Sequence, residues 1–189
     1  HPGLVAAYDL HEAEGRFFLS LELVDGRSLR EVVAERGPMP IDDVVALGRQ
    51  LAETLSWLNG RGLVHRDVKP GNVLLDSGGR ARLCDLGLVR PLEQGATVTE
   101  TATVLGTPAY MAPEQATGAA LTGATDVYGL GLTLFCALPG EVPLVESTAV
   151  ATLVRRQRER APRVRRSRPD CPAWLDRLIG AMLEPRPGD

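Results

Sequence analysis

Apolar and polar residues follow one another along the chain in a pattern that predicts two short strands and then a long amphipathic helix. Leu4 to Leu10 and Arg16 to Leu23 are mainly apolar stretches on either side of a polar, turn-like segment, which favours an antiparallel pair. From about Ile41 to Asn59, apolar side chains recur at steps of three and four, which is typical of a helix with one buried face. The residues on that face are Val44, Leu47, Leu51, Leu55 and Leu58.

Shorter elements are predicted before and after this helix. Ser28 is placed to cap a helix that runs to about Glu35, because its hydroxyl can accept from the free amides of the first turn. Val73 to Leu75 and Arg82 to Cys84 are predicted strands, joined by a hairpin turn at residues 76–79.

The last part of the chain is predicted to be a loop followed by helices. Residues 91–107 are polar and rich in threonine, with no apolar period, so we expect a loop. From about Asp126 onward the pattern is mostly helical. The apolar run from Leu130 to Leu138 falls far short of the roughly 20 residues that a membrane span needs, and it indicates a buried core helix.

Composition places the chain among ordinary soluble domains. It has 189 residues, of which 44% are hydrophobic and 24% charged, and its formal net charge is −3. This balance gives no reason to expect affinity for nucleic acid or for a membrane surface. The three cysteines are far apart and fit neither a metal site nor a disulfide framework, so we expect free thiols in a reducing compartment.

Three short motifs occur in order along the chain. His65 to Asn72 reads His-Arg-Asp and places an asparagine five residues after the aspartate; Asp85-Leu86-Gly87 follows, and then Gly106 to Glu114, which ends in Ala-Pro-Glu. Lys69 is the one lysine among 21 basic residues. A lysine is a compact point charge that the planar fork of an arginine does not replace, so its position beside a candidate catalytic aspartate indicates a specific role.

This ordered set resembles the eukaryotic-like serine/threonine protein kinases, most closely their bacterial branch, over the whole of residues 1–189. The resemblance implies an α+β, protein kinase-like fold, with a mostly helical C-lobe and the last two strands of the N-lobe sheet. Residues 1–26 would be the end of the N-lobe with the hinge, and residues 27–189 a C-lobe that is truncated at its C-terminal end.

The resemblance also assigns the chemistry. Asp67 would orient the substrate hydroxyl, Lys69 would hold the γ-phosphate of ATP, and Thr107 would bond to both. Asn72 and Asp85 would bind Mg²⁺, with Mn²⁺ as an alternative. The remaining contacts with ATP would come from the gatekeeper position, the hinge and the nucleotide cleft. Lys69 and Asp85 would contact ATP as well. These residues are Leu21, Glu22, Val24, Leu74, Lys69 and Asp85.

Regulation and support of the site are implied in the same way. Arg66 beside the catalytic aspartate suggests control by phosphorylation of the activation loop, with Thr99 and Thr101 on the matching acceptor positions, although a solvated Thr-rich loop explains them equally well. The dense arginines of residues 155–168 are interpreted as a solvated face rather than a dock for an acidic partner.

Three further residues are expected to have structural roles: His65, Glu114 and Asp126. Asp126 would bond to the backbone of the catalytic loop, and a helix N-cap is compatible with that role. Glu114 is expected to have no visible partner, because the arginine that pairs with it in the family does not occur before residue 189. Cys84 is interpreted as a core residue rather than a reactive thiol.

The expected function is ATP-dependent phosphorylation of serine and threonine in proteins, in the cytoplasm or in the cytoplasmic part of a longer, membrane-anchored protein. Partners would be protein substrates and a second kinase copy for trans-autophosphorylation, with no nucleic acid and no membrane contact by this segment. The Gly-rich loop, the strand-three lysine and the helix-C glutamate of the family do not occur in residues 1–189, so these residues alone are expected to have little activity.

Two other functions stay open. A pseudokinase or interaction module would bind without phosphotransfer, but a remnant of that kind is expected to lose some of the four polar residues that are all present here: Asp67, Lys69, Asn72 and Asp85. A small-molecule kinase of the aminoglycoside-phosphotransferase type would share the loop pattern, but the segment from Gly106 to Glu114 resembles a peptide-binding segment that such enzymes lack.

Overall fold

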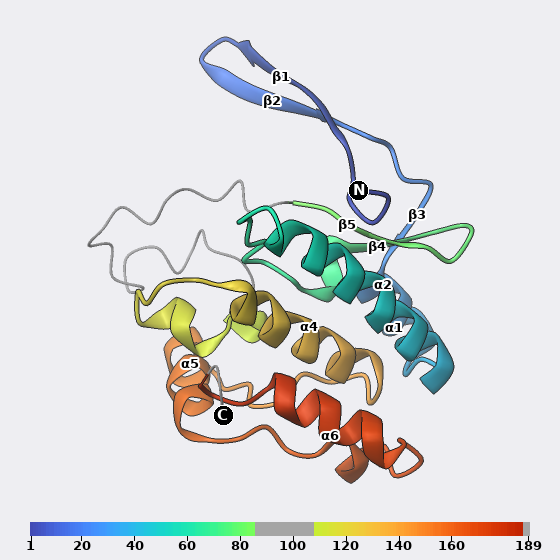
Figure 1. The fold of residues 1–189 in the computed structure, drawn as a ribbon, viewed down its shortest axis with the longest axis vertical. Coiled ribbons are helices and arrows are strands. Elements are labelled where there is room, and N and C mark those ends of the chain that lie inside the picture. Colours follow the sequence, from blue (N-terminus) through green and yellow to red (C-terminus); the bar gives the residue numbers. More distant parts are fainter. Residues whose placement is uncertain (86–107, 187–189) are drawn as a thin grey trace.

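The helices pack together into a body that carries two small antiparallel sheets (Figure 1). The computed structural model describes residues 1–85 and 108–186. β1 (Ala7–Ala13) and β2 (Arg16–Leu21) form a ribbon that projects away from the helices. β3 (Gly26–Ser28), β4 (Val73–Asp76) and β5 (Ala81–Leu83) form the second sheet, in that order. The predicted α+β class is confirmed.

The β1–β2 ribbon turns at two residues rather than across the longer polar segment that the sequence suggested. Glu14 and Gly15 have φ values of 53° and 70°, the left-handed conformation that tight hairpin turns require. β1 therefore continues through His11 and Glu12 to Ala13. Every residue of β1 is exposed, so polar side chains fit anywhere along it and do not mark a turn.

The second sheet contains a strand that the sequence did not indicate. Gly26, which reads as a strand breaker, begins β3 and pairs with Asp76 of β4. A Cβ at this position would lie 2.1 Å from the carbonyl oxygen of Leu75, so only glycine lets the two backbones approach this closely. The N-terminal segment joins the same sheet through a parallel bridge between Leu4 and Leu83.

The helices agree closely with the sequence pattern. α1 (Leu29–Arg36) has Ser28 as its N-cap, in a capping box completed by Glu31. α2 (Ile41–Asn59) has the predicted bounds, and its predicted apolar face is buried. The C-terminal part contains α4 (Gly123–Ala137), α5 (Ala149–Arg158) and α6 (Ala173–Met182).

α4 is the centre of the helical body. Its residues from Tyr128 to Ala137 are all buried, which confirms the predicted core helix. The helix begins at Gly123, capped by the hydroxyl of Thr122, so Asp126 lies within its first turn and is not the N-cap. Among the described residues, no helix is both long and apolar enough to cross a lipid bilayer.

The capping box makes a stability prediction. Replacing Ser28 by alanine removes the hydroxyl that accepts from the N–H of Glu31, and it should lower the free energy of unfolding by about 1 kcal/mol in urea denaturation followed by circular dichroism. Ser56→Ala, at an exposed position inside α2, is the matched control and should change stability by less than about 0.5 kcal/mol. Equal losses in the two variants would contradict the capping role.

Candidate active site

The predicted catalytic residues gather where the chain passes from α2 into β4. Lys69 Nζ donates to Asp67 Oδ2 at 2.6 Å, and Asn72 Nδ2 donates to the same oxygen at 2.8 Å. Asn72 also donates to the backbone carbonyl of Asp67 at 2.9 Å. No described residue donates to Oδ1 of Asp67, so this oxygen can face an incoming hydroxyl while Oδ2 is held by two donors.

The backbone of this loop is attached to the core by one buried carboxylate. Asp126, which is 2% exposed on α4, accepts from the N–H groups of His65 and Arg66, both at 2.8 Å. These are the contacts that the sequence led us to expect of Asp126. Burial raises the pKa of Asp126, and the two backbone donors act against that rise by favouring the charged form.

His65 is completely buried behind the loop. Its Nε2 lies 3.1 Å from the carbonyl oxygen of Cys84, and its Nδ1 accepts from the N–H of Asp67 at 3.4 Å. One ring nitrogen therefore donates and the other accepts, which is the pattern of a neutral imidazole. Burial lowers the pKa of His65, in agreement with that form.

Two residues of the site have backbones in the left-handed region that favours glycine. Arg66 has a φ of 70° and Asp85 a φ of 58°. A non-glycine residue in this conformation costs about 1–3 kcal/mol and is retained where surrounding contacts impose it. For Arg66 the contacts are visible, because Asp126 binds its N–H and the side chain of Gln115 donates to its carbonyl at 2.9 Å.

The β4–β5 hairpin brings the two predicted metal ligands together. Val73 pairs with Leu83, and the N–H of Cys84 donates to the carbonyl of Asn72 at 2.9 Å, so Cys84 lies opposite Asn72 and Asp85 is the next residue along the chain. The charges of Asp67 and Asp85 both affect the pKa of His65 and of Cys84, as expected for carboxylates near the same two residues.

The donor set fits a hard divalent cation. Because the amide nitrogen of Asn72 is engaged by Asp67, its oxygen is the group left for a cation, and Asp85 presents an exposed carboxylate. Among the described residues, no group of three or more His, Cys, Asp or Glu side chains could hold a metal ion. Two protein oxygens with phosphates and water are the arrangement in which Mg²⁺ is usually bound.

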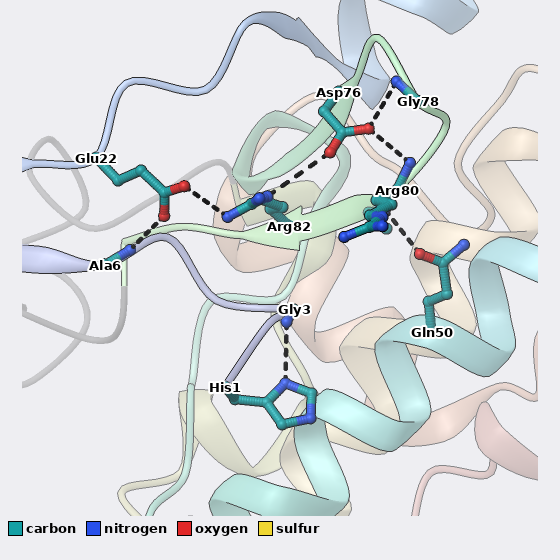
Figure 2. Close-up of polar contacts among 10 residues, drawn as sticks. His1, Gly3, Ala6, Glu22, Gln50, Asp76, Gly78, Arg80 and Arg82 are labelled. Carbon is teal, nitrogen blue, oxygen red and sulfur yellow. Dashed lines mark hydrogen bonds and ion pairs between the residues drawn. The ribbon is translucent and has the colours of Figure 1, made fainter.

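Glu22, a predicted hinge residue, has its carboxylate engaged by protein groups (Figure 2). Its Oε1 accepts from Arg82 at 2.7 Å and its Oε2 from the N–H of Ala6 at 3.3 Å. Arg82, on β5, also lies 3.8 Å from Asp76 at the other end of the hairpin. The carboxylate thus connects the predicted hinge to the strand that leads to Asp85, and the backbone N–H of Glu22 donates to the carbonyl of Ala6 at 2.8 Å.

The other predicted nucleotide contacts come from the two sheets and from the segment that connects them in sequence. Leu21 ends β2 and pairs with Ala7, and Leu74 is the half-buried partner of Arg82. Val24 is half-buried and lies in the segment that connects β2 to β3.

Burial is the main cause that raises the pKa of Cys84 to about 11, so its thiol stays protonated at neutral pH, in agreement with a core role.

The segment that ends in Ala-Pro-Glu is attached to the rest of the site by two residues that the sequence did not single out. Gln115 accepts from the N–H of Ala112 at 2.8 Å and donates to the carbonyl of Arg66. The hydroxyl of Thr125 donates to Glu114 at 2.7 Å. The expectation that Glu114 has no partner is therefore wrong: its partner among the described residues is a neutral hydroxyl from the first turn of α4.

Three predicted site residues, Thr99, Thr101 and Thr107, lie outside the described residues, as do Leu86 and Gly87. A cavity of about 730 Å³ lies elsewhere, between α1, α2 and the β4–β5 turn. Its lining includes Met39, Gln50 and Leu75 but none of the catalytic-loop residues. The chemistry assigned above therefore rests on the loop geometry and not on this cavity.

Comparison with known proteins agrees with this geometry. The family described as "Protein kinase domain" matches residues 1–189, and the chain belongs to that family. It is 37% identical to the serine/threonine-protein kinase PknL of Mycobacterium tuberculosis over 186 residues, 98% of this chain and 46% of the relative. It is 36% identical to PknB of Mycobacterium leprae over 163 residues, 84% of this chain and 26% of the relative.

PrkC of Bacillus subtilis is 32% identical over 179 residues, 95% of this chain and 28% of the relative. All three relatives are named as bacterial serine/threonine-protein kinases, which confirms the resemblance inferred from the motifs. The chain thus spans between about a quarter and a half of the length of these relatives.

The attachment of the loop to α4 predicts a large effect of a small change. Asp126→Asn replaces one acceptor oxygen by an NH₂ group that faces a backbone N–H, and it should lower the free energy of unfolding by about 3 kcal/mol in chemical denaturation. Asp43→Asn, exposed in the first turn of α2, should cost less than about 1 kcal/mol. Similar losses of unfolding free energy in both variants would show that the hydrogen bonds of Asp126 to the loop contribute no more to stability than an exposed carboxylate does.

The packing of α4 against the same loop predicts a steric effect. A Cβ on Gly129 would lie 2.9 Å from the carbonyl oxygen of Val68, next to Asp67. Gly129→Ala should lower the free energy of unfolding in urea by about 1–3 kcal/mol. The added methyl group would push α4 away from the loop, and both are fixed by other contacts. Gly71→Ala, whose Cβ would meet nothing within 4 Å, should stay within about 0.5 kcal/mol of wild type. Unchanged stability of Gly129→Ala would refute the close contact.

Proposed function

We propose that the protein containing this chain transfers the γ-phosphate of ATP to serine or threonine hydroxyls of other proteins. The observation that carries the proposal is the pair of donors, Lys69 and Asn72, on one oxygen of Asp67. This arrangement fixes the carboxylate and leaves its second oxygen to orient a hydroxyl. Phosphoryl transfer needs alignment and charge stabilisation more than covalent work by the protein.

Each residue then has a defined task. Oδ1 of Asp67 accepts the hydrogen bond of the acceptor hydroxyl and aligns its oxygen with the γ-phosphorus. Lys69 stands beside that carboxylate with a side chain that is only 16% exposed, so its charge is partly shielded from water and can stabilise the transferred phosphate. Thr107 is proposed to bond to Asp67 and Lys69.

The family uses ATP with a divalent cation, and we propose Mg²⁺, with Mn²⁺ as an alternative. Asn72 Oδ1 and the Asp85 carboxylate would hold it. Such an ion neutralises charge on the phosphates when bound. The hinge from Leu21 to Val24 would receive the adenine through its backbone, since the carboxylate of Glu22 is engaged by Arg82.

We propose regulation by phosphorylation of Thr99 and Thr101, with Arg66 as a cationic partner, in trans within a kinase–kinase dimer. We also propose the division into residues 1–26 and 27–189, and a location in the cytoplasm. These proposals rest on the sequence resemblance. The exposed side chain of Arg66, whose backbone is held in place by Asp126, supports its part in them.

Transfer of labelled phosphate from ATP tests the function. In the full-length protein with Mg²⁺, wild type should label itself and a serine/threonine peptide, whereas Asp67→Asn should reduce the rate by about 10²–10⁴-fold, the share typical of a positioned acid or base. Asp42→Asn, exposed on α2, is the matched control and should retain wild-type labelling. ATP binding without label in wild type would overturn the proposal in favour of a pseudokinase.

A further inference from the structure

Arg156, at the C-terminal end of α5, is the largest fully buried side chain in the described part of the chain. It lies in the arginine-dense stretch that the sequence suggested was a solvated face, and for this residue that interpretation is wrong. Burying a guanidinium is costly unless its N–H groups are satisfied. The position therefore requires an explanation from its contacts.

The guanidinium binds backbone carbonyls from two separate segments. Nη1 donates to Met111 at 3.0 Å, and Nη2 donates to Ala109 at 2.5 Å and to Pro143 at 3.1 Å. Ala109 and Met111 belong to the segment that ends in Ala-Pro-Glu, whereas Pro143 lies between α4 and α5. A planar fork with donors in fixed directions can hold both segments at once.

The segment held in this way leads directly to the catalytic aspartate. The next residue of α5, Gln157, donates to the carbonyl of Pro113 at 3.5 Å. Further along, Gln115 donates to the carbonyl of Arg66, the residue before Asp67. Residues 109–115 are thus held by α5 at one end and bonded to the catalytic loop at the other. Because Gln115 is bonded to the residue before Asp67, this segment is near the point that the hydroxyl of an acceptor polypeptide would have to reach.

We propose that Arg156 is a positioning residue for the acceptor polypeptide: by holding the carbonyls of Ala109 and Met111, it sets the backbone against which a protein substrate docks. The assignment rests on the proposed function. The three bonds given above all join Arg156 to backbone carbonyls of residues 109, 111 and 143, so the proposal places its influence on peptide binding rather than on ATP binding or on the chemical step with water.

A lysine at this position would keep the charge but not the geometry. Its single ammonium group cannot span carbonyls that the guanidinium reaches with two different nitrogens. Arg156→Lys therefore tests whether the effect depends on bridging the two segments or only on a positive charge at this position. Arg155 is the natural control, because it precedes Arg156 on α5 and its side chain pairs at the surface with Glu146 and Glu159.

The test compares steady-state kinetics of the full-length protein with a serine/threonine peptide and with ATP. For Arg156→Lys, KM for the peptide should rise about tenfold, the size expected from losing one hydrogen bond to a charged donor. KM for ATP and the rate of ATP hydrolysis without peptide should stay within about twofold of wild type. Arg155→Met should leave all three values unchanged.

The following results would overturn the assignment or its basis. An unchanged peptide KM in Arg156→Lys rejects the positioning role, and so does an equal loss in peptide and ATP parameters, which is the mark of a merely structural residue. A wild type that transfers no phosphate removes the proposed function and the assignment with it. If thermal unfolding shows that Arg156→Lys does not fold, Gln157→Ala is the second test of the role. In this variant KM for the peptide should rise about two- to fivefold, with the ATP values unchanged. No rise in KM for the peptide rejects the role.

Discussion

The site depends on one buried carboxylate that accepts two backbone hydrogen bonds. Asp126 comes from α4, the helix around which the body is packed, and binds the N–H groups of His65 and Arg66. Charge-assisted bonds of this kind are roughly twice as strong as neutral ones. They allow Arg66 to keep a left-handed backbone, and they place Asp67 at a fixed distance from the core rather than on a free loop.

The same solution recurs at three other places in the part of the chain that the structure describes. Backbone groups in segments without regular secondary structure have no helix or sheet partners and must be satisfied by side chains or water. Gln115 binds the catalytic loop, Arg156 binds the segment that ends in Ala-Pro-Glu, and Glu22 binds the N–H of Ala6. Long polar side chains thus hold irregular segments of the described chain in place.

The site also shows how a fixed framework leaves specific atoms available. Two donors engage Oδ2 of Asp67, and the amide nitrogen of Asn72 is engaged by the same residue. The groups that remain are one carboxylate oxygen, which we propose for the acceptor hydroxyl, and one amide oxygen, which we propose for a cation. The β4–β5 hairpin ends two residues before Asp85, and the contacts that place Asp67 and Asn72 leave free the oxygens to which we assign tasks.

The sequence by itself determined whatever depends on neighbouring residues. The cap at Ser28, the bounds of α2 and the β4–β5 hairpin follow from local hydrogen bonding and from a period of apolar side chains, and the ordered motifs established the family. The tertiary structure decided what depends on residues distant in sequence. Gly26 is a strand residue because its backbone packs closely against that of Leu75. Glu114 accepts a hydrogen bond from the hydroxyl of Thr125, and Arg156 is buried. No local sequence pattern encodes these outcomes. Each depends on a residue far away in sequence that the packing of the fold brings to within a few ångströms.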